Sequence, residues 1–458
     1  MPMSEFRSVG DVLNGIQHGP AQRKLLAATG ATWALAAMEV LLISFALPTM
    51  TETWSLSGTA AGILGSASLG GMVLGSPIGG RLADRYGRLR TLRLMVALYA
   101  VSAGLTALAT GVVSASVLRV LTGIGIGGTA TATTVYLSEH LADDRRDRYL
   151  TYLDAFWAIG SIASVVLAWL LLTPAVLPAT PGPIDRWRYL FVLGASPIVL
   201  LPLLRRLGDS PHYLATRGRA AEARDRLRAI ARTNGADVDI SASSLGVRSS
   251  DGGDSAIGRL LAPSLARRTT VTSLAWFGTN LGFFGVFIWL PGAVGAAQLV
   301  GGTYQYLLLA SLVQIPGYVS AAHLVERIGP KRTLGSYLVL SGLGTYLFAA
   351  ALPGVGFARF SGFWPFLVGL LAASFFSVGA FGSLRAYTPA QFPTSLRSTG
   401  SGVAEGTGRV AGILGPILAG SLVDVSYLVA LAPLAVGFAL AGVLVIGFGA
   451  DAPDSASA

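Results

Sequence analysis

The sequence contains no cysteine, only two lysines and little charge of either sign. The absence of Cys excludes disulfides, thiolate catalysis and Cys-ligated metal sites. Neither Lys24 nor Lys331 stands in a Gly-Lys-Ser/Thr setting, which excludes a Walker A loop for ATP. Only 12% of the residues are charged, whereas soluble domains carry about 25%. The composition therefore predicts a membrane protein, and the four scattered His residues predict neither a metal site nor a cofactor.

Apolar runs of roughly 20 residues recur along the 458 residues, and each can cross about 30 Å of hydrocarbon as a helix. We place the runs at 25–49, 59–80, 91–113, 115–137, 149–172, 188–206, 270–296, 303–325, 333–353, 364–387, 399–423 and 427–449. The predicted fold is all-α, with six-helix halves at 25–206 and 269–450. Tails are expected at 1–24 and 451–458. A linker with short helices is expected at 207–268, and its Ser/Gly/Asp-rich part, 241–255, is expected to be a flexible tether.

The distribution of Lys and Arg predicts the orientation in the membrane. With the amino terminus inside, the inner segments hold 28 of the 33 basic residues, and the outer loops hold only Arg186, Arg188 and Arg359. Basic residues concentrate on the cytoplasmic side of membrane proteins. We therefore expect both termini in the cytoplasm, and the net charge of +10 reflects this bias rather than a nucleic-acid partner.

A charged loop occurs twice, once in each half. Residues 82–92 read Leu-Ala-Asp-Arg-Tyr-Gly-Arg-Leu-Arg-Thr-Leu, and residues 324–334 read Leu-Val-Glu-Arg-Ile-Gly-Pro-Lys-Arg-Thr-Leu. Such a repeat indicates two related membrane halves. The Gly-rich segment 123–128 matches the dinucleotide pattern Gly-x-Gly-x-x-Gly, but it lies in an apolar span, and we interpret it as a close helix contact.

Two charges inside the spans are expected to be partners. Glu39 lies about 14 residues into the first helix, roughly 21 Å from its inner end, and Arg119 lies at a similar depth in the descending fourth helix. Charges in a bilayer usually face the interior of the bundle and serve a function. Protonation of Glu39 would release Arg119 and bias a conformational change, whereas the alternative is a fixed structural salt bridge.

A second set of polar and aromatic residues predicts a central binding site. Arg409 lies roughly 15 Å into the eleventh helix, so it can meet an anionic solute, although the alternative is internal neutralisation by Glu405 one turn away. The aromatic residues suit a flat ring, although they are also typical of packing. The remaining candidates are Asn280, Phe283, Phe284, Phe287 and Trp157, with Asp154 as an inner gate or packing group.

The chain resembles the major facilitator superfamily over essentially its full length. Residues 80–88 resemble the family's loop signature between helices two and three, and residues 119–127 resemble its fourth-helix signature. Glu139, Arg146, the segment 209–211 and the segment 392–397 resemble marks of the branch with sugar porters and organic-ion transporters. By this resemblance, Glu39 and Arg119 stand where proton-coupled sugar porters keep an acid and an arginine.

The resemblance also bears on the solute. The amide side chains with which sugar porters bind hydroxyls are replaced here by Gly278, Thr279 and Phe284, which disfavours a sugar. Segments 316–318, 387–394 and 408–416 resemble niacin, aromatic-acid and organic-anion transporters, and anion carriers keep an arginine where Arg409 stands. Gln391 replaces a usual Glu, and Pro330 interrupts the second loop signature.

We therefore predict a proton-coupled secondary transporter of a small organic anion, an aromatic carboxylate such as nicotinate, and not an enzyme. It is expected to be monomeric in a bacterial inner membrane, with protons, solute and lipid bilayer as its partners. The alternatives are an organic-cation or drug exporter and a membrane protein that binds its ligand without transport. The resemblance implies an inner clasp of the outward-open state, formed by Asp84, Arg85, Arg88, Glu139, Arg146, Glu326, Arg327 and Arg397.

Overall fold

The computed structural model describes residues 7–173, 185–236, 245–246, 256–297, 302–352, 362–393 and 396–451. Arg359, most of segment 241–255, residues 1–6 and residues 452–458 lie outside these ranges, as do positions 394 and 395 of the 392–397 motif.

The described residues contain twelve helical spans long and apolar enough to cross a membrane, which confirms the predicted fold class. The third span ends at Thr106 rather than at the predicted position 113, because the backbone N–H groups of residues 107–109 donate to the carbonyls three positions earlier and form tight turns. The spans of the amino-terminal half are α2 (Pro20–Thr53), α3 (Gly58–Tyr86), α4 (Arg88–Thr106), α5 (Val112–Ser138), α6 (Asp143–Leu172), and α7 (Arg186–Gly194) continued by the 3-10 helix η1 (Ser196–Leu200) and α8 (Leu201–Arg205). Those of the carboxy-terminal half are α12 (Pro263–Ala296), α13 (Thr303–Leu312) continued by α14 (Gln314–Ile328), α15 (Pro330–Ala350), α16 (Phe363–Ala390), α17 (Arg397–Val423) and α18 (Tyr427–Phe448).

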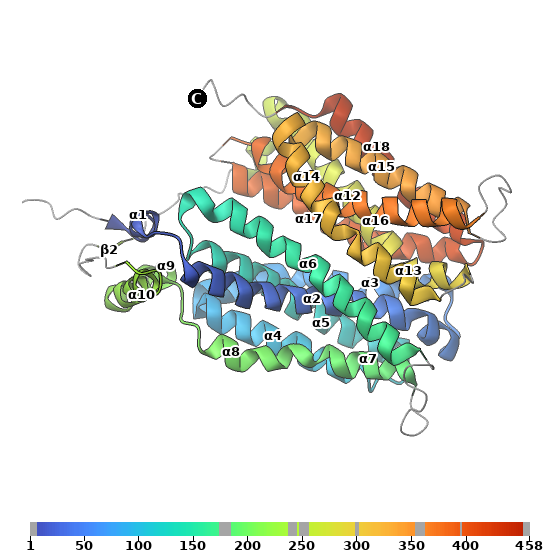
Figure 1. Cartoon of the computed structure of the whole chain (residues 1–458), viewed down its shortest axis with the longest axis horizontal. Coiled ribbons are helices and arrows are strands. Elements are labelled where there is room, and N and C mark those ends of the chain that lie inside the picture. Colours follow the sequence, from blue (N-terminus) through green and yellow to red (C-terminus); the bar gives the residue numbers. More distant parts are fainter. Residues whose placement is uncertain are drawn as a thin grey trace, which may run out of the picture.

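Short elements gather beyond one end of the bundle, which we call the linker end; the opposite end is the far end (Figure 1). They are β1 (Arg7–Ser8), α1 (Val9–Gly15), α9 (Pro211–Thr216), α10 (Ala220–Thr233) and β2 (Leu245–Gly246), whereas the short helix α11 (Ala256–Leu260) packs against α12 and α17 of the carboxy-terminal half. The strands β1 and β2 pair in parallel. Apolar residues of α1 pack against Leu227 and Ala231 of α10, which connects the amino-terminal segment to the linker helices.

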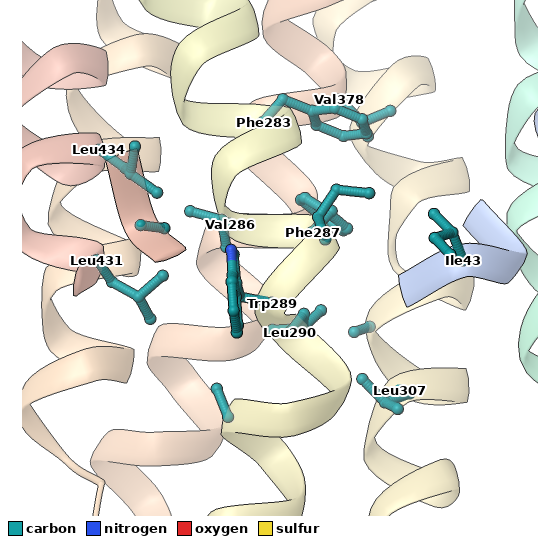
Figure 2. Close-up of a cluster of buried hydrophobic side chains, with 14 of the residues drawn as sticks. Ile43, Phe283, Val286, Phe287, Trp289, Leu290, Leu307, Val378, Leu431 and Leu434 are labelled. Carbon is teal, nitrogen blue, oxygen red and sulfur yellow. The ribbon is translucent and has the colours of Figure 1, made fainter. Parts of the chain in front are cut away.

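The two sets of spans form two groups of helices that lie against each other (Figure 1). A buried apolar cluster is centred on α12, whose Phe283, Val286, Phe287, Trp289 and Leu290 are drawn in Figure 2. It reaches Ile43 of α2 in one direction and Leu431 and Leu434 of α18 in the other (Figure 2). The helix α12 therefore packs both against its own half and against the first helix of the other half.

The repeated loop has the same backbone form in both halves. Gly87 has φ +99° and Gly329 has φ +86°, and each glycine directly precedes a helix, α4 and α15 respectively. Residues with a Cβ rarely adopt this conformation, which explains the glycine at this position of both copies.

The segment 123–128 makes the close helix contact expected from its small residues. A Cβ on Gly123 would overlap the carbonyl oxygen of Ser68 in α3, and a Cβ on Gly75 would overlap that of Ile124 in α5. The helices α3 and α5 therefore touch backbone to backbone, which confirms the packing interpretation and rules out a nucleotide-binding loop at this segment.

Candidate functional site between the two halves

A central cavity of about 350 Å³ lies between the halves. Its walls come from α2, α3, α5 and α6 on one side and from α12, α14, α16 and α17 on the other. The lining residues of α5 (130–135) belong to its last three turns, and those of α6 (151–157) to its first half, so the cavity extends toward the linker end.

The far end is closed by direct contacts between the halves. A Cβ on Gly58 or Gly62 of α3 would overlap backbone atoms of α17, and the Gly58 N–H donates to Asp424 Oδ2 at 3.3 Å. The hydroxyl oxygens of Ser161 in α6 and Ser311 in α13 lie 3.2 Å apart. The central cavity is therefore separated from the far end by packed helices.

Aromatic rings form much of the cavity wall. The ring of Trp157 lies 5.8 Å from Trp33 and 6.4 Å from both Phe283 and Phe284. The indole N–H groups of Trp33 and Trp157 are buried and have no hydrogen-bond partner among the described residues. A flat solute would find ring faces for stacking here.

Four charged side chains form a connected network in the cavity and bridge the halves. Arg385 Nε of α16 lies 3.1 Å from Asp154 Oδ2 of α6, and Arg385 Nη1 lies 3.8 Å from Glu405 Oε2 of α17. Arg409 Nη2 donates to Glu405 Oε1 at 3.2 Å. The four side chains are 27 to 46% exposed, so solvent and solute can reach them. Among the described residues, no cluster of His, Asp and Glu could hold a metal ion.

Glu39 and Arg119 form an ion pair away from the central cavity. Both side chains are 0% exposed, and Arg119 also donates to the Glu39 backbone carbonyl at 3.0 Å. The guanidinium stacks on Phe191 of α7 at 5.4 Å, and Gly194 provides the space for the Glu39 carboxylate. The pair lies between α2, α5 and α7, and neither residue lines the cavity.

The clasp residues lie at the linker end and do not join the halves in this structure. Arg88 contacts Glu139 at 2.9 Å and Asp84 at 3.3 Å, all within the amino-terminal half. Glu139 also accepts a hydrogen bond from Ser210, which connects it to the linker. Arg146 pairs with Asp143, and the guanidinium of Arg85 lies over Tyr86. Over the described ranges, no ion pair links Glu326, Arg327 or Arg397 to the amino-terminal half.

The structure brings most of the expected binding residues to one cavity but not all. Arg409, Glu405, Asn280, Phe283, Phe284 and Trp157 line it. Phe287 does not, because it lies one turn beyond Phe283 toward the closed far end, where its ring stacks on Phe283 at 4.4 Å and borders a separate void of about 20 Å³.

Sequence reasoning missed two lining residues that matter. Arg385 is one of the 28 basic residues that the orientation prediction counts in the inner segments, but it lies within the tenth span, near its inner end, and lines the cavity. Its position inside a predicted span is the signal that could have identified it. Trp33 lies six residues before Glu39 on α2, but it faces the cavity while Glu39 faces the interior of its own half.

Comparison with known proteins agrees with this geometry. The family model of the Major Facilitator Superfamily matches residues 29–317. The chain is 29% identical to the putative niacin/nicotinamide transporter NiaP of Bacillus subtilis over 94% of this chain and 98% of that protein, and 29% identical to the niacin transporter NiaP of Acinetobacter baylyi over 89% of each. A partially occluded inward-open structure of the xylose transporter XylE from E. coli superposes with a TM-score of 0.73 at 16% identity, over 94% of this chain and 100% of that one. The chain is a multi-pass membrane transporter that belongs to the Major Facilitator Superfamily.

Proposed function

We propose that this transporter carries a small aromatic carboxylate such as nicotinate together with protons, by alternating access. The observation that carries the proposal is the pair of arginines, Arg385 and Arg409, in a cavity walled by aromatic rings. The cavity volume falls within the range of small-molecule sites. Two relatives, one named as a putative niacin/nicotinamide transporter and one as a niacin transporter, align over 94% and 89% of this chain and support a solute of this size and ring type.

The solute carboxylate would exchange with an internal carboxylate at an arginine. Arg409 is held by Glu405, and Arg385 is held by Asp154 and Glu405, so neither guanidinium is without a counter-charge before the solute arrives. An incoming carboxylate offers two acceptor oxygens, which match the geometry of a guanidinium. The aromatic residues of the cavity wall would then stack on the ring.

Glu39 and Arg119 would couple proton binding to the conformational change. Because the pair has no exposed surface, protonation of Glu39 would leave a buried guanidinium without its counter-charge, and the packing of α2 against α5 and α7 would have to change. Two of these three helices also carry residues that line the cavity: α2 carries Trp33, and α5 carries residues in the segment 130–135. The coupling would therefore reach the solute through movement of whole helices rather than through direct contact.

The linker end would face the cytoplasm, as the distribution of basic residues predicts. On this assignment the closed far end and the cavity near the linker end correspond to an inward-facing state. The clasp would form in the outward-facing state, when Glu326, Arg327 and Arg397 approach the cluster of Asp84, Arg85, Arg88, Glu139 and Arg146.

Uptake into proteoliposomes tests the proposal. An inward-directed proton gradient should drive nicotinate accumulation, and Glu39→Gln should abolish the response to the gradient while solute exchange at equal pH persists. Uptake by the wild-type protein that ignores the gradient would contradict the coupling. Arg409→Ala should lose most of the nicotinate affinity and keep only weak binding by the aromatic wall.

A cation carrier is the second candidate, because Asp154 and Glu405 also line the cavity. In that case organic cations would displace the bound ligand, and Arg409→Ala would be tolerated. Competition between nicotinate and a panel of aromatic amines of similar size separates the two candidates.

A further inference from the structure

We propose that a groove on the outer surface of the amino-terminal half, formed by α3, α4 and α8, binds the phosphate headgroup of an anionic phospholipid. The groove has a volume of about 540 Å³ and shares no lining residue with the central cavity. Its lining residues are Leu82, Tyr86, Arg90, Thr91, Arg93, Leu94, Ala97, Leu201 and Arg205. The inference is independent of the identity of the transported solute.

Three arginines of the groove have no acidic partner among the residues that the structure describes. Arg90 and Arg93 come from the first turns of α4, and Arg205 comes from the end of α8, which packs beside α4 (Figure 1). None of the nine described lining residues is acidic, and none of the three arginines forms an ion pair or a hydrogen bond with another described residue. Arg88, only two positions before Arg90, is held by both Asp84 and Glu139. The groove therefore combines three positive charges that no described side chain neutralises.

A buried hydroxyl in the same groove also lacks a partner. Thr91 is 2% exposed, and its Oγ1 has no hydrogen-bond partner among the described residues. The internal repeat provides a comparison, because Thr333 occupies the same position of the second loop copy and donates to the backbone carbonyl of Gly329 at 2.8 Å. Buried hydroxyls are normally satisfied in this way. A phosphate oxygen bound by the arginines would give Thr91 the acceptor that it lacks.

The surroundings favour a lipid over a free phosphate. Arg93 lies five residues after Arg88, roughly 7.5 Å along α4, so the arginines are at the level where the headgroups of a bilayer begin. From the groove, α4 continues as an exposed apolar stripe of Leu94, Val101 and Leu105, at 55, 49 and 44% exposure. The residues recur at spacings of seven and four, so they share one helix face. A lipid would place its phosphate among the arginines and its acyl chains along this stripe.

Native mass spectrometry of the purified full-length protein tests the site. The protein in detergent is mixed with equal amounts of phosphatidylglycerol and phosphatidylcholine that carry the same acyl chains. The wild type should retain phosphatidylglycerol preferentially. The double variant Arg90→Gln/Thr91→Val should bind phosphatidylglycerol more weakly than the wild type. Loss of the arginine charge should account for about five-fold of the decrease and loss of the hydroxyl for about ten-fold. The aligned residues of the second repeat provide the control, Arg332→Gln/Thr333→Val, which should bind phosphatidylglycerol like the wild type.

Equal loss in both double variants, or equal retention of the two lipids by the wild type, would overturn the proposal. If the test variant does not fold, Arg205→Gln, which changes one exposed side chain on α8, should still weaken phosphatidylglycerol binding about five-fold. Thermal stabilisation of the wild-type protein provides a further arm. Phosphatidylglycerol should raise the unfolding temperature and glycerol 3-phosphate should not, whereas an equal effect of glycerol 3-phosphate would assign the groove to a soluble phosphate and refute the lipid.

Discussion

Removing the charge of Glu39 or of Arg119 alone should destabilise the protein far more than removing both charges together. Both side chains are fully buried, so Glu39→Gln leaves an uncompensated guanidinium and Arg119→Gln an uncompensated carboxylate. Loss of one partner of such a pair costs about 3–5 kcal/mol. In the double variant the two amides are neutral and can hydrogen-bond to each other, so we expect a coupling energy of at least about 2 kcal/mol in a double-mutant cycle.

The assay is unfolding by SDS in mixed micelles, followed by tryptophan fluorescence of the purified variants. The ion pair of Arg219 with Glu222 at the start of α10 provides a matched control, because both side chains are about half exposed. Substitution of either residue by Gln should leave the unfolding midpoint unchanged. Single variants of Glu39 and Arg119 that each lose less than about 1 kcal/mol, or whose effects simply add, would refute the account of a buried, mutually dependent pair.

Three further results are expected. Gly75→Ala should destabilise the protein by about 1–3 kcal/mol in the same SDS unfolding assay, because the added Cβ has no space against α5. Gly406→Ala should leave the stability unchanged, because no atom lies within 4 Å of the added Cβ. Burial lowers the pKa of His140 from 6.5 to about 4, so the unfolded state binds a proton at a higher pH than the folded state does. The free energy of unfolding should therefore fall by about 3 kcal/mol between pH 6.5 and 4, and His140→Gln should remove this pH dependence. Asp154→Asn should raise nicotinate affinity up to about five-fold in calorimetry by removing a partly exposed competitor for Arg385, whereas Asp154→Glu should keep the wild-type value.

The sequence was sufficient for the features that depend on position along a helix. Run lengths placed the twelve spans, and the residue counts from the helix ends brought Glu39 and Arg119 to one depth, where the structure pairs them. The repeated loop likewise indicated two halves, and the positive φ of Gly87 and Gly329 shows why glycine is needed in both copies.

Features that depend on how the halves meet could not be obtained in this way. Phe283 and Phe287 are one turn apart on the same helix, and only the closure of the far end decides that the first borders the cavity and the second is packed away from it. The ion pair of Asp154 with Arg385 joins helices from different halves, so no spacing within either helix predicts it. An arginine near a helix end, such as Arg385, is equally consistent with an inner loop, so its sequence position does not show that it reaches the cavity.

Binding of nicotinate and nicotinamide to the same purified protein shows whether the cavity selects a negative charge, because the two compounds differ in charge but hardly in shape. Nicotinate should bind at least ten-fold more tightly in calorimetry, and Arg409→Ala should remove this preference while the aromatic wall still binds both compounds weakly. Equal affinities in the wild type, or a preference that survives Arg409→Ala, would contradict an arginine-based anion site in the cavity.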